Sequence, residues 1–307
     1  MNKYPLGIER DLIRLYRAEI QKFERRAIRE VISAWKKYYE RYIETDAADD
    51  PFLAIDDIIR GISEKYKIPI DRVNRIFASL DKWSYNTTLK KTRDANTPDY
   101  LQDINIIKTD GVLATMLKKY ASRNAALIKE VIMDDGSAVN QAITKTVQET
   151  VAKLAKKSVS MGDSISTLSK NISAKTGVIK RKADFWARDQ IGKAYGDMNS
   201  YRHEKAGFPG YIWMANLDNR VRDSHAERHG QYYTYADGGL KPGDDYNCRC
   251  DADPAFPGEE LSVTERAAAQ REIEKERKWA KKEKEIERRE AAAAIKAKRE
   301  KQKKRTA

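Results

Sequence analysis

The chain has 307 residues, of which 40% are hydrophobic and 35% are charged. This composition is enough for one large or two modest domains, and the high charged fraction requires that part of the chain is solvated helix or tail. No apolar segment of a signal peptide begins the chain, and no run approaches the roughly 18 apolar residues of a membrane span, which disfavours secreted and membrane-spanning classes. We therefore expect synthesis and use in a cytoplasm, or in a particle assembled there.

The charge balance is basic, with 60 Lys and Arg against 47 Asp and Glu and a net charge of +13. A basic excess favours contact with polyanions, because each neutralised phosphate releases counterions. Much of this excess is local. The segment from Thr264 to Ala307 holds 17 basic and 9 acidic residues, so the rest of the chain is close to ordinary.

Residues 9–44 are predicted to form one long helix of about 50 Å. Apolar and aromatic residues recur at steps of three or four along one face: Leu12, Tyr16, Ile20, Phe23, Ala27, Val31, Ala34, Tyr38 and Tyr42. Such a stripe must pack on other helices or on another subunit. Aromatic residues such as Phe23 and Trp35 serve equally as core or as interface anchors. Contact with a partner or a second copy through residues 9–44 therefore stays open beside an intramolecular core.

Further helical patterns follow over residues 52–110 and from Val112 to Gly162. A next helix is predicted to begin at Gly162 and to close at Gly177. Residues 179–207 are predicted to form another helix, which Gly207 and Pro209 end.

After Pro209 the residue pattern changes from helical periodicity to strand and loop segments. The segments Tyr211–Met214 and Gln231–Tyr235 are strand candidates, and the Gly-rich segment Ala236–Asp244 is a loop. We expect a mainly α fold, with long helices in a bundle, a small α+β module at residues 208–257 and a projecting charged helix. The corresponding regions are 1–111, a partner-contact candidate, 112–257, and a basic tail at 258–307.

An ordered set of motifs runs through the second region. Its members are Arg188, Trp213, Asp218, Arg220, Arg222, His225, Gly230, Pro242, Asn247, Cys248, Arg249 and Cys250. In this order they resemble the phage minor head protein family, also called the Mu F-like or head morphogenesis family. The resemblance covers roughly Lys118 to Pro257. The chain departs from the family in having Asp189-Gln190 where members usually have Thr-Glu, and Arg228-His229 where they often have Leu-Asp.

This resemblance implies a structural, non-enzymatic protein of a tailed-phage head. Such proteins are present in few copies near the portal vertex, and they act in head assembly and in genome packaging or delivery. The implied partners are the portal protein and other head proteins, and the implied location is the virion, after synthesis in the host cytoplasm. No separate catalytic domain is expected, because a charged helix alone follows the shared module.

Three residues of the module are suitable zinc ligands: His225, Cys248 and Cys250. His229 or Asp218 is a candidate for the fourth ligand. The Cys-x-Cys spacing is shorter than the usual zinc spacing. The alternative is that the two cysteines alternate in a short strand, one of them buried, while His225 bonds backbone. Zinc is the one cofactor that the sequence indicates.

Two other functions stay open. A metal-dependent nuclease would combine His225, Asn247 and a nearby carboxylate, although general acid–base chemistry needs a full pocket that residue types alone do not show. A generic DNA-binding or scaffolding-like helical protein would also fit. Arg220 and Arg222 bind an acidic partner in one interpretation and form local ion pairs in the other.

The C-terminal helix ends in a basic cluster that suits non-specific contact with double-stranded DNA. The residues are Lys298, Arg299, Lys301, Lys303, Lys304 and Arg305. Alternatively, this helix is solvated and its acidic residues offset the bases, or it docks on a partner through Trp279 and Ile286.

Overall fold

The computed structural model describes residues 4–45, 57–58, 60–62, 64–92, 105–130 and 161–306. Its long helices are α1 (Leu6–Thr45), α3 (Ile70–Thr92), α6 (Met161–Lys205) and α8 (Val263–Thr306). A further helix covers residues 111–130. The short elements are β1 (Gly210–Met214), α7 (Asp223–Glu227), β2 (Tyr232–Thr234) and β3 (Asp251–Ala255). The predicted fold class, mainly α with a small α+β module, is confirmed.

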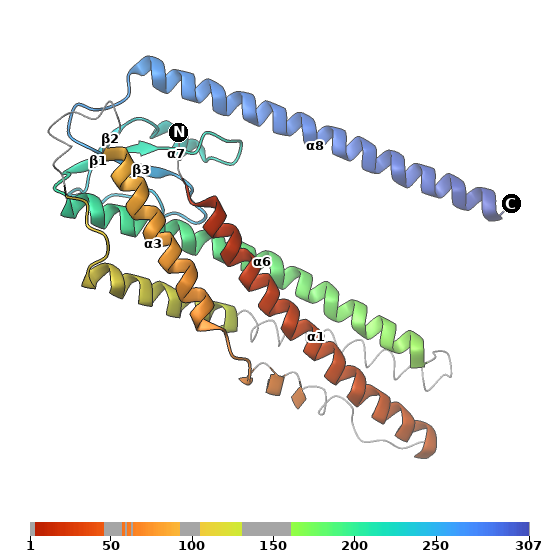
Figure 1. The fold of residues 1–307 in the computed structure, drawn as a ribbon. Helices are drawn as coiled ribbons and strands as arrows, with labels where there is room; N and C mark the ends of the chain where they lie inside the picture. Colours follow the sequence, from red (N-terminus) through yellow and green to blue (C-terminus); the bar gives the residue numbers. More distant parts are fainter. Residues whose placement is uncertain are drawn as a thin grey trace.

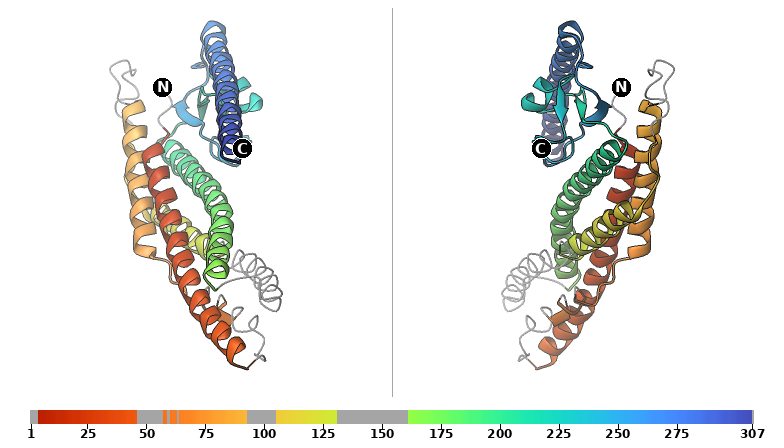
Figure 2. Two further views of the ribbon diagram at one scale, coloured as in Figure 1. Left: turned by 90° about the vertical axis from the view of Figure 1, so that its right-hand side faces the viewer. Right: turned by 90° about the vertical axis from the view of Figure 1, so that its left-hand side faces the viewer.

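The helices α1, α3 and α6 lie side by side in a bundle, and the small sheet lies at one end of it (Figures 1 and 2). The predicted stripe of α1 faces the interior of this bundle, where these side chains are fully buried: Leu12, Tyr16, Ile20, Phe23, Ala27, Val31 and Trp35. Phe23 and Trp35 are therefore core residues and form no exposed interface. The predicted Ala34 is half-buried. The side chains of Tyr38 and Tyr42 lie outside the described residues.

One core joins the first two predicted regions of the chain. Trp35 on α1, Phe77 on α3 and Leu113 on the helix at 111–130 belong to the same buried cluster as Ile191 on α6. The apolar residues on either side of position 111 are thus buried against one another.

Helix α6 corrects one prediction. The sequence predicted two helices separated at Gly177, but the structure has a single helix from Met161 to Lys205. One glycine costs a helix only about 1 kcal/mol, which the packing of neighbouring turns can offset. The predicted end at Gly207 is right. Gly207 has a φ of +89°, and Phe208 N–H donates to the His203 carbonyl at 3.0 Å, which is a glycine-type helix ending.

A buried arginine links three parts of the bundle. The side chain of Arg202 is fully buried on α6 and forms an ion pair with Asp81 of α3. It also donates to Ser84 Oγ at 2.6 Å and to the Lys108 carbonyl at 2.7 Å. These bonds offset the cost of burying a charge, which is large unless the charge is paired and hydrogen-bonded.

The sheet has three antiparallel strands in the order β2-β1-β3. Tyr211 of β1 pairs with Tyr233 of β2 and with Pro254 of β3. Both predicted strands are confirmed, but β3 was missed. Its sequence contains two Asp and one Pro, residues that are depleted in strands, and Pro254 is tolerated because β3 is an edge strand.

A buried lysine attaches β3 to the bundle. Lys91 Nζ, near the end of α3, lies 2.8 Å from Asp251 Oδ2 and 2.5 Å from Asp253 Oδ1, and it donates to the Ala252 carbonyl at 2.8 Å. Burial opposes the charged form, yet the two carboxylates outweigh it and raise the pKa of Lys91. The ion pair therefore fixes the module relative to the bundle.

Helix α8 begins in a capping box, in which Glu265 N–H donates to Ser262 Oγ at 3.2 Å and Ser262 N–H donates to Glu265 Oε2 at 2.9 Å. Its first turns pack on the module through Ile273, which is buried, and Gln270, which donates to the Ala226 carbonyl at 2.7 Å. The rest of α8 projects away from the module (Figure 1). None of the described helices combines the length and apolarity needed to cross a membrane.

Candidate functional site

Three predicted ligands meet at one point in the module. His225 lies on α7, and Cys248 and Cys250 lie in the segment that leads into β3. His225 Nδ1 is 3.6 Å from Cys248 Sγ and 3.4 Å from Cys250 Sγ. All three side chains are buried, both thiols are free, and the three ligand atoms lie within 4.8 Å of one another. We call these three residues the Cys–His cluster.

The His225 ring is held from two other sides. Its Nε2 lies 2.8 Å from Asp245 Oδ2, and the Trp213 ring packs edge-on against it with centroids 5.1 Å apart. An Nε2–H that donates to Asp245 leaves the Nδ1 lone pair directed at the two sulfur atoms. The orientation of the ring is thereby fixed before any ligand arrives.

The cluster changes the acidity of its members. The hydrogen bond from Cys250 lowers the pKa of Cys248, aided by His225 and by the backbone N–H groups of Gly243 and Cys250, and this outweighs burial. The same bond and burial raise the pKa of Cys250. Hydrogen bonds to Cys248 and Asp245 raise the pKa of His225 although burial lowers it. The pair therefore loses its first proton more readily than an isolated buried thiol, because hydrogen bonds from its neighbours stabilise the thiolate.

The loop that carries Cys248 rests directly on the backbone of α6. A Cβ added to Gly192 would lie 2.7 Å from the Cys248 carbonyl oxygen, and one added to Gly196 would lie 2.2 Å from the Pro242 carbonyl oxygen. On the loop side, Gly243 has a φ of +104°, which favours glycine. Because Gly192 and Gly196 have no Cβ, the loop can lie directly against the backbone of α6, and this contact sets the position of Cys248.

A buried carboxylate anchors the same loop. Asp189 Oδ1 on α6 accepts the Asn247 N–H at 3.2 Å, and its Oδ2 pairs with Lys193 Nζ at 2.8 Å. Asn247 adopts a φ of +54°. The sequence had marked Asp189 only as a departure from the family. Neither its role nor that of Gly192 and Gly196 is visible in the residue pattern.

The charged motif residues tie the turn at 218–222 to the cysteine segment. Arg249 donates to both oxygens of Asp218, at 2.9 and 2.7 Å, and Arg220 N–H donates to Asp218 Oδ1 at 3.0 Å. Arg222 donates to the Tyr246 carbonyl at 2.6 Å. Asp218 is therefore occupied by Arg249, and it is not among the residues brought to the Cys–His cluster.

The remaining predicted residues lie around the module rather than in the cluster. His229 Nδ1 accepts the Ala215 N–H at 3.1 Å. Gly230 has a φ of +77° and donates its N–H to the Trp213 carbonyl at 2.9 Å. The Arg188 carbonyl accepts the Tyr4 hydroxyl at 3.5 Å. Among the described residues, the cluster thus offers three ligands, and His229 does not complete it.

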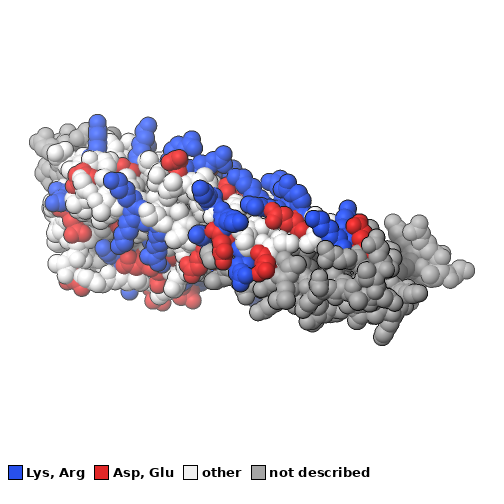
Figure 3. Space-filling view, turned by 90° about the horizontal axis from the view of Figure 1, so that it is seen from below, with Lys and Arg blue, Asp and Glu red and all other residues white. Residues whose placement is uncertain are grey.

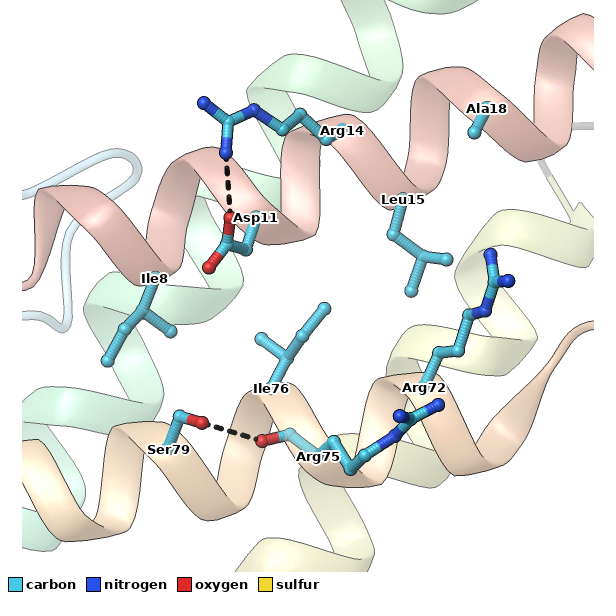
Figure 4. Close-up of a pocket in the computed structure, with 9 residues that line it drawn as sticks. All are labelled: Ile8, Asp11, Arg14, Leu15, Ala18, Arg72, Arg75, Ile76 and Ser79. Atoms are coloured by element: carbon cyan, nitrogen blue, oxygen red, sulfur yellow. Dashed lines mark hydrogen bonds and ion pairs between the residues drawn. The ribbon is translucent and has the colours of Figure 1, made fainter.

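A separate open groove of about 530 Å³ lies between α1 and α3 (Figure 4). Leu15 lines it together with three arginines, Arg14, Arg72 and Arg75. Arg14 is paired with Asp11 at 3.0 Å.

On the face of the molecule seen in Figure 3, acidic side chains are interspersed among the Lys and Arg side chains. The positive charge on that face is therefore not concentrated in one patch.

The predicted DNA-contact residues lie near the end of α8. The backbone of α8 is helical through Thr306, but the following side chains lie outside the described residues: Lys298, Arg299, Lys301, Lys303, Lys304 and Arg305. Trp279 and Ile286, the proposed docking residues of α8, are 63% and 50% exposed.

Comparison with known proteins agrees with the resemblance carried by the motifs. Residues 149–253 match the model of the family described as Phage Mu protein F like protein, which confirms the predicted family resemblance. An 87-residue stretch is 42% identical to an uncharacterized protein of Haemophilus influenzae (strain ATCC 51907 / DSM 11121 / KW20 / Rd). It covers 27% of this chain and 20% of that protein, so the chain spans about a fifth of the curated relative that it matches. No solved structure matches the chain.

Proposed function

We propose that this chain, which resembles the Phage Mu protein F like family over residues 149–253, is a structural minor head protein of a tailed phage. It acts near the portal vertex, in head assembly and in genome packaging or delivery. The observation that carries the proposal is this family match, which includes α6 from Met161 onward, β1, α7, β2 and the Cys–His cluster.

The state of His225 supports a structural role over the nuclease alternative. A general base needs a ring nitrogen within hydrogen-bond reach of its substrate. Here Nε2 is bound to Asp245, Nδ1 faces two sulfur atoms, and the residue is 2% exposed. Plasmid incubated with the protein and Mg²⁺, Mn²⁺ or Zn²⁺ should remain supercoiled. Nicking that His225→Ala abolishes would favour the nuclease instead.

Contact with DNA belongs to the projecting part of α8. Its first turns cannot be removed without exposing the module, because Ile273 is part of the module core. The test therefore neutralises three basic residues beyond the docked turns by substitution with glutamine: Lys303, Lys304 and Arg305. A matched control neutralises three exposed lysines midway along the same helix: Lys281, Lys282 and Lys284.

The distal triple substitution should weaken DNA binding and lower the dependence of log K on log salt by about one for each lost phosphate contact. The control triple should change this slope less. Equal loss in both variants would mean that overall charge, rather than the end of α8, determines binding. Unchanged binding in both would remove α8 as the DNA contact.

The location of the protein in assembled heads tests the proposed function. Heads purified from cells that carry the phage should contain the chain in few copies, and a tag on it should appear at one vertex by electron microscopy. A heterologous cytoplasmic protein with the same tag serves as the control for trapping during assembly. Absence from heads, or an even distribution over the shell, would contradict the proposal.

A further inference from the structure

We infer that His225 Nδ1, Cys248 Sγ and Cys250 Sγ bind one Zn²⁺ ion. The inference does not depend on the role in phage heads. Two thiols and an imidazole are the ligand types that zinc prefers, whereas Mg²⁺ and Ca²⁺ prefer oxygen.

The distances fit an ion at the centre of the cluster. Zinc bonds to sulfur at about 2.3 Å and to imidazole nitrogen at about 2.0–2.1 Å, so a tetrahedral site places nitrogen and sulfur about 3.5 Å apart. The two observed separations from His225 Nδ1 are 3.4 and 3.6 Å. Both nitrogen–sulfur separations therefore already match those of a tetrahedral zinc site.

Hydrogen bonds can also join the three side chains, because Cys250 bonds to Cys248 and one thiol can donate to the single Nδ1 lone pair of His225. A cation between the three atoms engages all of them at once. The choice between hydrogen-bonded thiols and a metal site is therefore decided by the measurement of bound metal.

The short spacing of the cysteines is explained by the chain around them. Cys248 and Cys250 both reach His225 Nδ1, while Arg249 between them reaches Asp218. This is the alternation that residues i and i+2 of an extended chain would show. Both cysteines are buried, at 2% and 5% exposure. The alternative in which only one of them is buried is therefore wrong.

The surroundings of His225 match those of a zinc-bound histidine. Metal-binding histidines usually donate their second ring N–H to a carboxylate, which fixes the tautomer and the ring orientation. Asp245 occupies this place at 2.8 Å from Nε2. The ion would join α7 to the segment before β3, two elements separated by more than twenty residues.

The experiment measures metal in the full chain, purified without chelator from zinc-supplemented cells. We expect one zinc per chain by elemental analysis. Replacement by Co²⁺ should produce the charge-transfer absorption of cobalt bound to thiolate, a readout that requires no variant. Wild-type protein without stoichiometric zinc and without this absorption would overturn the inference.

Variants then test the ligand set. Cys248→Ser and Cys250→Ser should each lose zinc, and Asp245→Asn should weaken zinc binding about 10–100-fold, as second-sphere substitutions do. His229→Asn is the matched control and should retain one zinc per chain. If a cysteine variant fails to fold, Asp245→Asn still decides, because it removes no ligand. Full affinity in Asp245→Asn, or loss of zinc in His229→Asn, would contradict the assigned ligands.

Discussion

The helical bundle and the α+β module are stabilised in different ways. In the bundle, a regular stripe of large apolar residues, such as Phe23 and Trp35 on α1, packs against α3 and α6. The module core is smaller and includes Trp213 and both cysteines. Its loops are held by individual polar contacts, such as the ion pair of Asp218 with Arg249. The difference indicates that the bundle tolerates conservative apolar exchange, whereas the module depends on individual residues.

The largest expected effect is in the bundle core. Trp35→Ala should lower the free energy of unfolding by about 3–5 kcal/mol, because it removes a fully buried side chain and leaves a cavity. Trp279→Ala, at a side chain that is 63% exposed, should change it by no more than about 0.5 kcal/mol. Urea unfolding measures both. Similar values for the two tryptophans would refute the assignment of the α1 stripe to an intramolecular core.

The second prediction compares how alanine substitution at two glycines of α6 changes the stability of the protein. Gly196→Ala places a Cβ against the Pro242 carbonyl and should destabilise the protein by about 1–3 kcal/mol through overpacking. Gly177→Ala meets no neighbouring atom within 4 Å among the described residues outside its own turn, and should stabilise α6 by about 0.5–1 kcal/mol. Thermal unfolding of both variants tests this. The same sign for both would mean that the loop does not rest on α6.

A third prediction concerns pH and the buried His203. Burial lowers its pKa well below 6.5, aided by the charges of Lys91 and Arg202. Its contribution to stability is therefore present above pH 6.5 and is lost as the pH falls, because the unfolded chain binds a proton that the native chain excludes. The loss is at most about 1.4 kcal/mol for each pH unit below 6.5.

The His203→Asn variant should therefore lose less stability than wild type between pH 7 and pH 5, measured by urea unfolding. This difference between the two proteins removes the contribution of His225, whose raised pKa acts with the opposite sign. Parallel pH profiles would show that His203 is not the titrating group.

The smallest expected effect is a difference in coupling energy between two ion pairs. A double-mutant cycle on Asp218 and Arg249 should give a coupling energy of about 1 kcal/mol, because the pair has two hydrogen bonds and Arg249 is only 12% exposed. The exposed pair Glu285 and Arg289 on α8 should give about 0.3–0.5 kcal/mol. A coupling at Asp218 that is no larger than this would remove the pair as a determinant of the module.

The bundle was more predictable from sequence than the site. A 3.6-residue period indicates a buried helix face directly, which is why the stripe of α1 was found. The Cys–His cluster could be named by residue type, but its assembly depends on glycines and on Asp189 in a distant helix. Such close approaches leave no periodic signal. Strand β3 was missed because its pairing with β1 overrides the low strand propensity of Asp251 and Pro254.

Hydrogen exchange of the full chain, with and without a zinc chelator, tests most directly whether the two regions are held differently. We predict that the chelator raises exchange across β1, α7 and the segment from Asp245 to Ala255, while α1 and the part of α6 that packs against it keep their protection. Exchange that is unchanged by the chelator in both regions, or raised equally in both, would contradict this account.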